Sequence, residues 1–474
     1  MLFNSAIFVF LYLPIVWLGY LAALRLPWAR AGIAWLGVAS IFFYGYWNPA
    51  FVPLLVVSIL FNYGVGRLLD PAVWNASPAA RKAVLTGAIT LNLAALAWYK
   101  YAGLLSSSVG AVTGMDVPVI DVVLPIGISF YTFTQIAYLV DTWAERRPEK
   151  SFAAYVLFVT FFPHLIAGPV LHHAEMMPQF LRGDRAVRYA LVLEGLLFFA
   201  MGLAKKVLIA DSVAPAANRA FTLADSVPLG FVDSWFGSLA YTVQIYFDFS
   251  GYSDMAIGLA LLFGIRLPLN FNSPYKSRSI VEFWRCWHMT LSRFLRDYLY
   301  IPLGGSRHGP VRRQVNLMLT MLLGGLWHGA NWTFVLWGFL HGLGLAVHRI
   351  WTARMGDARL VRPGWLGTAL ATLATFTWVA ACFTIFRCAD IGTAFRFFTA
   401  RTVPDGSEPP SLDLWLLVLF AGAVHFVIAK KRDALREWLR RVPDLAFYPA
   451  LGMTAATLLY FTTLANEAFI YFQF

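Results

Sequence analysis

QVNLMLTMLLGGLWHGANWTFVLWGFLHGLGLAVH, residues 314–348, contains no Asp, Glu, Lys or Arg. The whole chain follows this trend, since 59% of its 474 residues are hydrophobic and only 13% are charged. An ordinary soluble domain carries about 25% charged residues, so this chain cannot cover a water-exposed surface of its own size. The composition excludes a soluble globular enzyme and predicts a polytopic membrane protein.

The apolar runs predict membrane-crossing helices. A helix needs about 20 mainly apolar residues to cross a bilayer core about 30 Å thick, and the runs suffice for about 11 crossings. Glycine and proline interrupt them at residues 125–127, 167–169 and 324–325. Irregular backbone at membrane depth survives only where protein or a water-filled cavity lines it. We therefore expect an all-α bundle, one domain over residues 1–474, with re-entrant or interfacial helices around an internal cavity.

The basic residues predict orientation rather than nucleic-acid binding. The formal net charge is +12, but Lys and Arg form short clusters between apolar runs instead of one patch. Such clusters mark cytoplasmic loops, which places the N-terminus, the loop 404–410 and the final residues 466–474 outside. The first apolar run is expected to stay as a span, because no basic segment or cleavage site accompanies it. The clusters expected in the cytoplasm are Arg25 and Arg30; Arg67, Arg81 and Lys82; Arg146, Arg147 and Lys150; Arg182, Arg185 and Arg188; Arg312 and Arg313; Arg349, Arg354, Arg359 and Arg362; and residues 430–441.

His328, in the charge-free stretch, is the first candidate for chemistry. Residues 314–327 would rise only about 20 Å as a helix, and both flanks of the stretch are predicted to be cytoplasmic, so a hairpin would hold His328 deep in the membrane. A histidine there should stay neutral, with one ring nitrogen able to accept a proton, which suits a general base. The alternative is a structural histidine that hydrogen-bonds a neighbouring helix. His341 and His348 stack on one helix face and are expected to be structural.

The second candidate is SRSIVEFWRCWHMTLSRFLRDYLYIPLGGSRHG, residues 277–309. Its pattern predicts an amphipathic helix at the membrane surface, with His288 at the boundary between the two faces. The arginines either form part of a site or bind anionic lipid. The polar face would carry Arg278, Glu282, Arg285, Met289, Ser292, Arg293 and Arg296, and the apolar face Phe283, Trp284, Trp287, Leu291, Phe294, Leu295 and Tyr298.

A third region, residues 244–275, places Asp248 and Asp254 inside apolar runs. Buried carboxylates need partners, so these side chains either line a polar tunnel or tie helices together. The candidate tunnel-lining residues are Asp248, Tyr252, Asp254 and Trp327. Lys205 and Lys206, which follow an apolar run, are interpreted as snorkelling anchors at the membrane surface.

Other chemistry has little support in the sequence. The three cysteines, Cys286, Cys382 and Cys388, have no metal-site spacing and are interpreted as small packing residues. No P-loop, dinucleotide-binding motif, nucleophile elbow or zinc ligand set is recognisable. We therefore expect no metal and no bound cofactor.

Four motifs make the chain resemble the membrane-bound O-acyltransferase family, in particular its bacterial branch that acetylates alginate and other polysaccharides. They are FDFSGYSDMAIGLALLFGI (247–265), LPLNFNSPY (267–275), EFWRCWHMTLSRFLRDYLYIPLGG (282–305) and LLGGLWHGANWTFVLWGFLHG (322–342), within a motif core of about 244–345. The resemblance implies a helical bundle around a trans-bilayer funnel. It matches His328 to the family's catalytic histidine and His288 to its second essential histidine. One departure is Cys286, where relatives commonly have a second arginine after Arg285.

The resemblance implies transfer of an acetyl group from cytoplasmic acetyl-CoA. His328 would act as base, and His288 would orient the acceptor or donate to the oxyanion. Asn331 would hold an imidazole or carbonyl if the helix continues that far. The donor phosphates would meet Lys276, Arg278, Arg285 and Arg293. The acceptor would be an exported or cell-wall polysaccharide, reached from the bacterial inner membrane through a periplasmic acetyltransferase of the SGNH (serine hydrolase-like) type.

Two alternatives stay open. The first keeps the enzyme but uses a lipid or a protein as acceptor. The second is a non-enzymatic transporter whose histidines relay protons, which would predict an inverted repeat of half-helices and acidic residues along the relay. No such repeat is recognisable, and the stretch around His328 contains no acidic residue.

Overall fold

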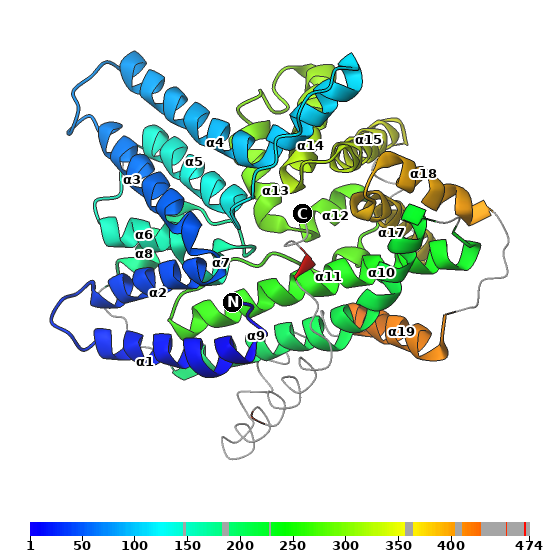
Figure 1. Cartoon of the computed structure of the whole chain (residues 1–474), viewed down its shortest axis with the longest axis horizontal. Coiled ribbons are helices and arrows are strands. Elements are labelled where there is room, and N and C mark those ends of the chain that lie inside the picture. The colour runs from blue at the N-terminus through cyan, green and yellow to red at the C-terminus, as the bar shows by residue number, and fades with distance from the viewer. Residues whose placement is uncertain are drawn as a thin grey trace. The chain divides into compact units, whose positions relative to one another are not determined.

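The computed structural model describes residues 1–145, 148–182, 189–226, 229–355, 364–402, 410–427, 452 and 469–470. Every regular element in these ranges is a helix (Figure 1), which confirms the all-α prediction for the described part of the chain. Several residues used to predict orientation lie outside the described ranges: Arg146, Arg147, Arg185, Arg188, Arg359 and Arg362, residues 404–409 and 430–441, and all of residues 466–474 except Phe469 and Ile470.

The described residues group into two compact units, and α11 contributes residues to both. Unit 1 comprises residues 1–199 and 252–268. Within it α2 packs on α1 and α6, and α5 packs on α3 and α4. Its elements are η1 (Phe8–Tyr12), α1 (Leu13–Ala23), α2 (Ala31–Trp47), η2 (Pro49–Phe51), α3 (Val52–Leu68), α4 (Pro78–Thr113), α5 (Ile128–Glu145), α6 (Phe152–Thr160), α7 (Phe162–Leu165), α8 (His173–Phe180) and most of α9 (Tyr189–Ala204).

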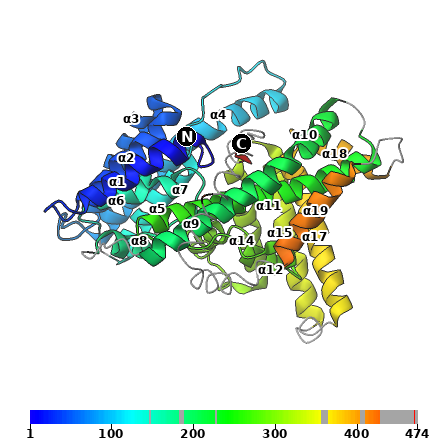
Figure 2. The same cartoon turned by 90° about the horizontal axis from the view of Figure 1, so that it is seen from below.

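Unit 2 comprises residues 200–251 and 269–474 and contains both candidate histidines. Here α14 packs on α15, and Figure 2 shows α15 and α17 side by side. Its elements are η3 (Lys205–Ala210), α10 (Asp211–Ser226), the first part of α11 (Phe231–Leu262), η4 (Pro274–Lys276), α12 (Ile280–Cys286), α13 (Met289–Leu295), η5 (Arg296–Tyr300), α14 (Gly309–His328), α15 (Trp332–Met355), α17 (Trp365–Arg387), α18 (Ile391–Thr399), η6 (Ala400–Thr402) and α19 (Leu412–Val427).

The helical hairpin predicted around His328 is confirmed. Helix α14 ends at His328, and α15 begins four residues later. Two glycines let these helices approach closely: a Cβ atom on Gly325 would lie 2.2 Å from the carbonyl oxygen of Phe334, and one on Gly338 would lie 2.3 Å from that of Met321. No larger residue fits at either position without moving the backbone.

The predicted chain breaks are partly confirmed. Residues 125–127 form a turn before α5, with Gly127 at a φ of +70°, and residues 167–169 follow α7 outside any helix. The break predicted at residues 324–325 is wrong, because α14 runs through both glycines. Gly325 serves the contact with α15 instead of interrupting the helix.

Three helices in the described ranges are long and apolar enough to cross a bilayer: Pro49–Leu68, Trp332–Arg354 and Trp365–Arg387. Three shorter apolar helices are Phe8–Ala23, Ala31–Trp47 and Leu412–Phe426. The prediction of about 11 crossings is therefore not confirmed. One reason is that apolar runs form short pieces, as where α6 ends at Thr160 and Pro163 lies in the separate helix α7.

Candidate active site

The backbone around His288 is the first distinctive feature of the site. The continuous amphipathic helix predicted from Ser277 is wrong, because α12 ends at Cys286 and α13 begins at Met289. Between them Trp287 is extended, and His288 adopts a left-handed conformation with φ 41° and ψ 53°. Positive φ is uncommon for a residue with a side chain. The break therefore points the imidazole in a direction that a continuous helix would not allow.

A segment earlier in the chain stabilises this break. The Asn272 N–H donates to the carbonyl oxygen of Cys286 at 2.9 Å, and the Met289 N–H donates to that of Asn270 at 2.9 Å. The side-chain oxygen of Asn270 accepts from the Thr290 N–H at 3.3 Å and from the Thr290 hydroxyl at 2.9 Å. Backbone groups that the helices leave unused at the break are thereby satisfied.

The same asparagine determines which nitrogen of His288 carries a proton. His288 Nδ1 lies 3.1 Å from Asn270 Oδ1. Because the Thr290 N–H can only donate, the Asn270 atom that it meets must be the carbonyl oxygen, so His288 Nδ1 must be the donor. His288 lies outside the three helices long enough to cross a bilayer, and burial lowers its pKa to about 3. The ring is therefore neutral at neutral pH, with an acceptor lone pair on Nε2.

His288 Nε2 is buried and meets no hydrogen-bond partner among the described residues. An aromatic wall lies beside the ring: Phe249 contacts it edge-on, with ring centroids 4.8 Å apart, and the Trp327 ring is 6.1 Å away. A buried acceptor that the protein leaves unused is costly. Such an atom is suited to a hydrogen-bond donor supplied by a ligand.

His328 is held differently. It is the last residue of α14, 6% exposed, and three aromatic rings surround it. The ring centroids of Trp327, Trp337 and Phe386 lie 4.9, 5.0 and 5.1 Å from that of His328, each in an edge-on arrangement. Trp327 contacts both histidines. The structure therefore places both predicted histidines beside one tryptophan.

Asn331 does not lie where the proposed contact with an imidazole requires it. That prediction assumed a helix continuing past His328, but α14 ends there. The Asn331 amide donates to the Ala389 carbonyl at 2.6 Å, and its oxygen accepts from the Thr333 N–H at 3.0 Å. One end of the side chain thus serves the start of α15 and the other the connection between α17 and α18, which is a structural role.

The four cations predicted to bind the donor lie on one segment, residues 276–293. Arg278 and Arg285 are exposed, whereas Lys276 and Arg293 are half-buried. Arg278 pairs with Glu282 at 3.5 Å, and an exposed pair of this kind contributes little to stability. Arg278 therefore remains able to meet a ligand.

Cys286 lies on the same segment, at the end of α12, and is half-buried. Burial raises the pKa of its thiol. A raised thiol pKa disfavours the nucleophilic thiolate, which agrees with its interpretation as a packing residue.

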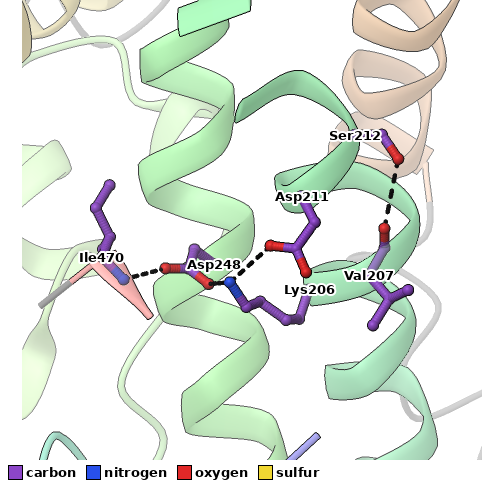
Figure 3. Close-up of polar contacts among 6 residues, drawn as sticks. All are labelled: Lys206, Val207, Asp211, Ser212, Asp248 and Ile470. Atoms are coloured by element: carbon purple, nitrogen blue, oxygen red, sulfur yellow. Dashed lines mark hydrogen bonds and ion pairs between the residues drawn. The ribbon is translucent and has the colours of Figure 1, made fainter. Parts of the chain in front are cut away.

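The predicted tunnel-lining residues are divided between the two units. Tyr252 and Asp254 belong to unit 1, where Tyr252 stacks on Phe3 at 4.8 Å. Asp248 and Trp327 belong to unit 2. Asp248 is buried and pairs with Lys206, so of its two predicted roles the structure shows the helix tie (Figure 3).

Two other predictions concern buried side chains. The interpretation of Lys206 as a snorkelling anchor is wrong, since its side chain is 6% exposed and lies between two carboxylates. One partner, Asp211, lies five residues on, where an α-helical pattern would not bring it to the side of Lys206, and the other, Asp248, is 42 residues away. His341 fits its expected structural role. The indole N–H of Trp284 donates to His341 Nδ1 at 3.2 Å, and the ring centroids of Trp337 and His341 lie 4.6 Å apart.

Unit 1 contains a cavity of about 250 Å³. Aromatic side chains of Tyr20, Phe180 and Phe263 line one part of it, and the polar side chains of Gln179 and Arg266 line another. None of the predicted catalytic or donor-binding residues is among its described lining residues. All of its described lining residues belong to unit 1.

Asn270 and Phe249 are site residues that sequence reasoning missed. Asn270 stands in an apolar context, in LPLNF (267–271). That context is a usable signal, because a buried amide needs hydrogen-bond partners. Phe249 gave no such signal among many phenylalanines.

Comparison with known proteins identifies the family of this chain. Residues 128–388, which include both histidines, match the model of the membrane-bound O-acyltransferase family. The chain is 41% identical over 425 residues to the peptidoglycan O-acetyltransferase of Helicobacter pylori, covering 84% of this chain and 79% of the relative. The chain belongs to the membrane-bound O-acyltransferase family.

Two further relatives indicate the breadth of the membrane-bound O-acyltransferase family around this chain. The probable alginate O-acetylase AlgI of Azotobacter vinelandii is 43% identical over 407 residues, 84% of this chain and 78% of the relative. The teichoic acid D-alanyltransferase of Streptococcus thermophilus is 25% identical over 239 residues, 48% of this chain and 57% of the relative. The resemblance seen in the motifs is confirmed, and the chain is a membrane O-acyltransferase.

Proposed function

We propose that this O-acyltransferase takes an acetyl group from cytoplasmic acetyl-CoA and passes it on for the O-acetylation of an exported or cell-wall polysaccharide. The observation that carries the proposal is the pair of buried histidines on Trp327, one of which has an unused acceptor nitrogen. Relatives named for the acetylation of peptidoglycan and alginate support acetyl as the group and a polysaccharide as the final acceptor.

In the proposed reaction the oxygen of the acceptor hydroxyl attacks the thioester carbonyl of acetyl-CoA, and His328 takes the proton from that hydroxyl. The new C–O bond forms, the C–S bond breaks, and the leaving thiolate of CoA recovers a proton. His288 contributes by accepting a hydrogen bond at Nε2 from the acceptor and orienting it. This role agrees with its tautomer, because a neutral ring protonated on Nδ1 has no hydrogen on Nε2 to donate to an oxyanion. Aromatic walls exclude water, which protects the thioester from hydrolysis.

Donor binding is assigned to Lys276, Arg278, Arg285 and Arg293. These side chains share the segment that carries His288 and retain exposed surface, so phosphates of CoA can reach them from water. Cys286 removes one cation that relatives commonly have. We therefore assign one arginine, Arg285, to this part of the donor site.

The proposal places the protein in the bacterial inner membrane with its N-terminus outside. The acetyl group is then collected on the periplasmic side by a partner transferase of the SGNH type. Basic clusters in the predicted cytoplasmic loops support this orientation. Neighbouring genes that encode such a transferase and a polymer synthase would identify the partner and the polymer class.

The test uses the purified full-length protein in lipid nanodiscs with radiolabelled acetyl-CoA and the partner transferase. His328→Ala should lower acetyl transfer by about 10²- to 10⁴-fold. His308→Ala, at an exposed histidine just before α14, is the matched control and should keep the normal rate. Normal transfer by correctly folded His328→Ala would overturn the assignment.

The same assay separates the alternatives. Acetylation of a lysolipid or a peptide by the purified protein alone would favour a lipid or protein acceptor. Substrate flux across the nanodisc or vesicle membrane without release of CoA would favour a transporter.

A further inference from the structure

A buried ion cluster lies in unit 2, outside the histidine pair (Figure 3). Lys206 Nζ lies 2.6 Å from an oxygen of Asp211 and 2.8 Å from an oxygen of Asp248. All three side chains are at most 6% exposed. Burying charges is expensive unless each is paired in good geometry, so the position of one member constrains the others.

Two backbone features bring the cluster together. Residues 205–210 form a π-helix, in which residue i bonds residue i+5. This geometry returns Asp211 to the side of Lys206, whereas an α-helix would set residues five apart about 140° from each other. In addition, a Cβ atom on Gly251 would lie 2.7 Å from the Gly202 carbonyl oxygen and 3.2 Å from the Lys206 nitrogen. The glycine therefore allows α11 to approach closely enough for Asp248 to meet Lys206.

The cluster also binds the backbone at Ile470. The second oxygen of Asp248 accepts the backbone N–H of Ile470 at 2.7 Å, in a buried hydrogen bond. Hydrogen bonds to a charged acceptor are roughly twice as strong as neutral ones. The ammonium group of Lys206 favours the charged form of this carboxylate and fixes its orientation.

Phe469, the residue before Ile470, contacts an aromatic residue of the candidate site. Phe469, next to Ile470, lies against Phe249 with ring centroids 6.1 Å apart, and Phe249 is the residue that contacts His288 edge-on at 4.8 Å. Phe249 also follows Asp248 directly on α11. Asp248 thus helps to position two aromatic residues near His288. Phe249 follows it on α11, and Phe469 precedes Ile470, whose N–H the Asp248 carboxylate binds.

We propose that Asp248, oriented by Lys206, is a positioning residue that anchors Phe469 and Ile470 against Phe249 and so aligns the neighbouring His288 for acetyl transfer. The role in transfer rests on the function proposed above, but the anchoring itself does not. Asp211 shares the lysine and makes no contact with Ile470 in the cluster. It therefore provides a matched control.

The experiment compares Asp248→Ala with Asp211→Ala in the full-length protein with a free C-terminus. Each variant leaves Lys206 one carboxylate partner, so neither creates an isolated buried charge. Two quantities are measured: the rate at which carboxypeptidase removes residues up to and including Ile470, followed by mass spectrometry, and the kcat and KM for acetyl-CoA.

We expect carboxypeptidase to remove Ile470 faster from Asp248→Ala than from the wild type. The same variant should lower kcat by about ten- to a hundredfold, with KM for acetyl-CoA within about twofold of the wild type. Asp211→Ala should keep the segment protected and kcat within about threefold. Asp248→Asn, which retains an oxygen for the Ile470 N–H, should lie between them. If Asp248→Ala does not fold, Asp248→Asn and Asp211→Asn are compared by the same two readouts.

Equal protection of Ile470 in the Asp248 and Asp211 variants would overturn the anchoring. Release of Ile470 without any change in kcat would overturn the positioning role. The proposed function is tested separately, because it fails if His328→Ala transfers acetyl at the normal rate. The carboxypeptidase assay of Ile470 does not depend on enzyme activity.

Discussion

His288 and His328 both lie beside Trp327, but different interactions hold them in place. His288 sits in a break between two short helices, with a left-handed backbone and a hydrogen bond to Asn270. His328 ends a regular helix and is packed between three aromatic rings. Hydrogen bonding determines which nitrogen of His288 carries the proton, whereas packing determines where the ring of His328 lies. This difference predicts different roles and different responses to mutation.

The largest expected effect tests the division of roles. His328→Ala should lower kcat by about 10²- to 10⁴-fold, because it removes the proposed base. His288→Ala should cost less, since orientation of the acceptor is only weakened. Residues that act as a unit are non-additive, so the double variant should be little worse than His328→Ala. A larger loss in His288→Ala than in His328→Ala would reverse the two roles. Single-turnover transfer from acetyl-CoA measures all three variants.

The next effect concerns the hydrogen bond to His288. Asn270→Ala removes the acceptor that selects the Nδ1–H tautomer, and we expect kcat to fall by about tenfold or more. Asn270→Asp keeps an acceptor and should retain more activity.

The Asn270→Asp variant also predicts a pH effect. Its carboxylate would stabilise the imidazolium and raise the pKa of His288 from about 3. The neutral ring is then lost at a higher pH as the solution is acidified, so the acid limb of the kcat profile should move to higher pH. An unchanged acid limb would show that His288 does not need to be neutral.

A smaller effect is expected from changing the aromatic packing around His328. Trp337→Phe keeps a ring near His328 but leaves unfilled volume, and should lower stability by about 1 kcal/mol and kcat by only a few-fold. Trp337→Ala should cost about 3–5 kcal/mol. Thermal unfolding in nanodiscs together with kcat measures both variants. A normal kcat in folded Trp337→Ala would show that packing does not position His328.

The last comparison separates the backbone of His288 from its ring, and its stability effect is smaller than that of Trp337→Ala. Asparagine tolerates the left-handed region better than branched residues do, so His288→Asn should unfold at nearly the wild-type temperature while losing activity. His288→Val should be less stable by about 1–3 kcal/mol. Equal stability of the two variants would mean that the backbone at this position relaxes without cost.

The sequence predicted the His328 region well because its pattern is local. A run of residues without Asp, Glu, Lys or Arg, with a loosened Gly329–Asn331 segment, predicts two adjacent helices and a buried histidine between them, and the structure shows this hairpin. The helix break predicted at Gly324 and Gly325 is wrong, because α14 continues through both residues. A glycine that breaks a helix and a glycine that packs against a neighbouring helix look the same in one sequence.

The His288 region was predicted less well because its structure depends on partners elsewhere in the chain. Helical periodicity favoured one long helix, but residues 270–272 compete for the backbone groups near Cys286 and Met289 and interrupt it. Lys206 is a similar case. It looked like a surface lysine until folding placed Asp248, 42 residues away, within 2.8 Å.

By itself the sequence determined the membrane class and the helical hairpin, and it singled out the two histidines as candidates. Charge depletion, helical periodicity and motif residues are written in consecutive positions. Only the tertiary structure decided the tautomer of His288, the aromatic surroundings of His328 and the anchoring of Ile470 by Asp248. The physical reason is that hydrogen bonds and packing act over a few ångströms in space, and the groups that make them here come from distant parts of the chain.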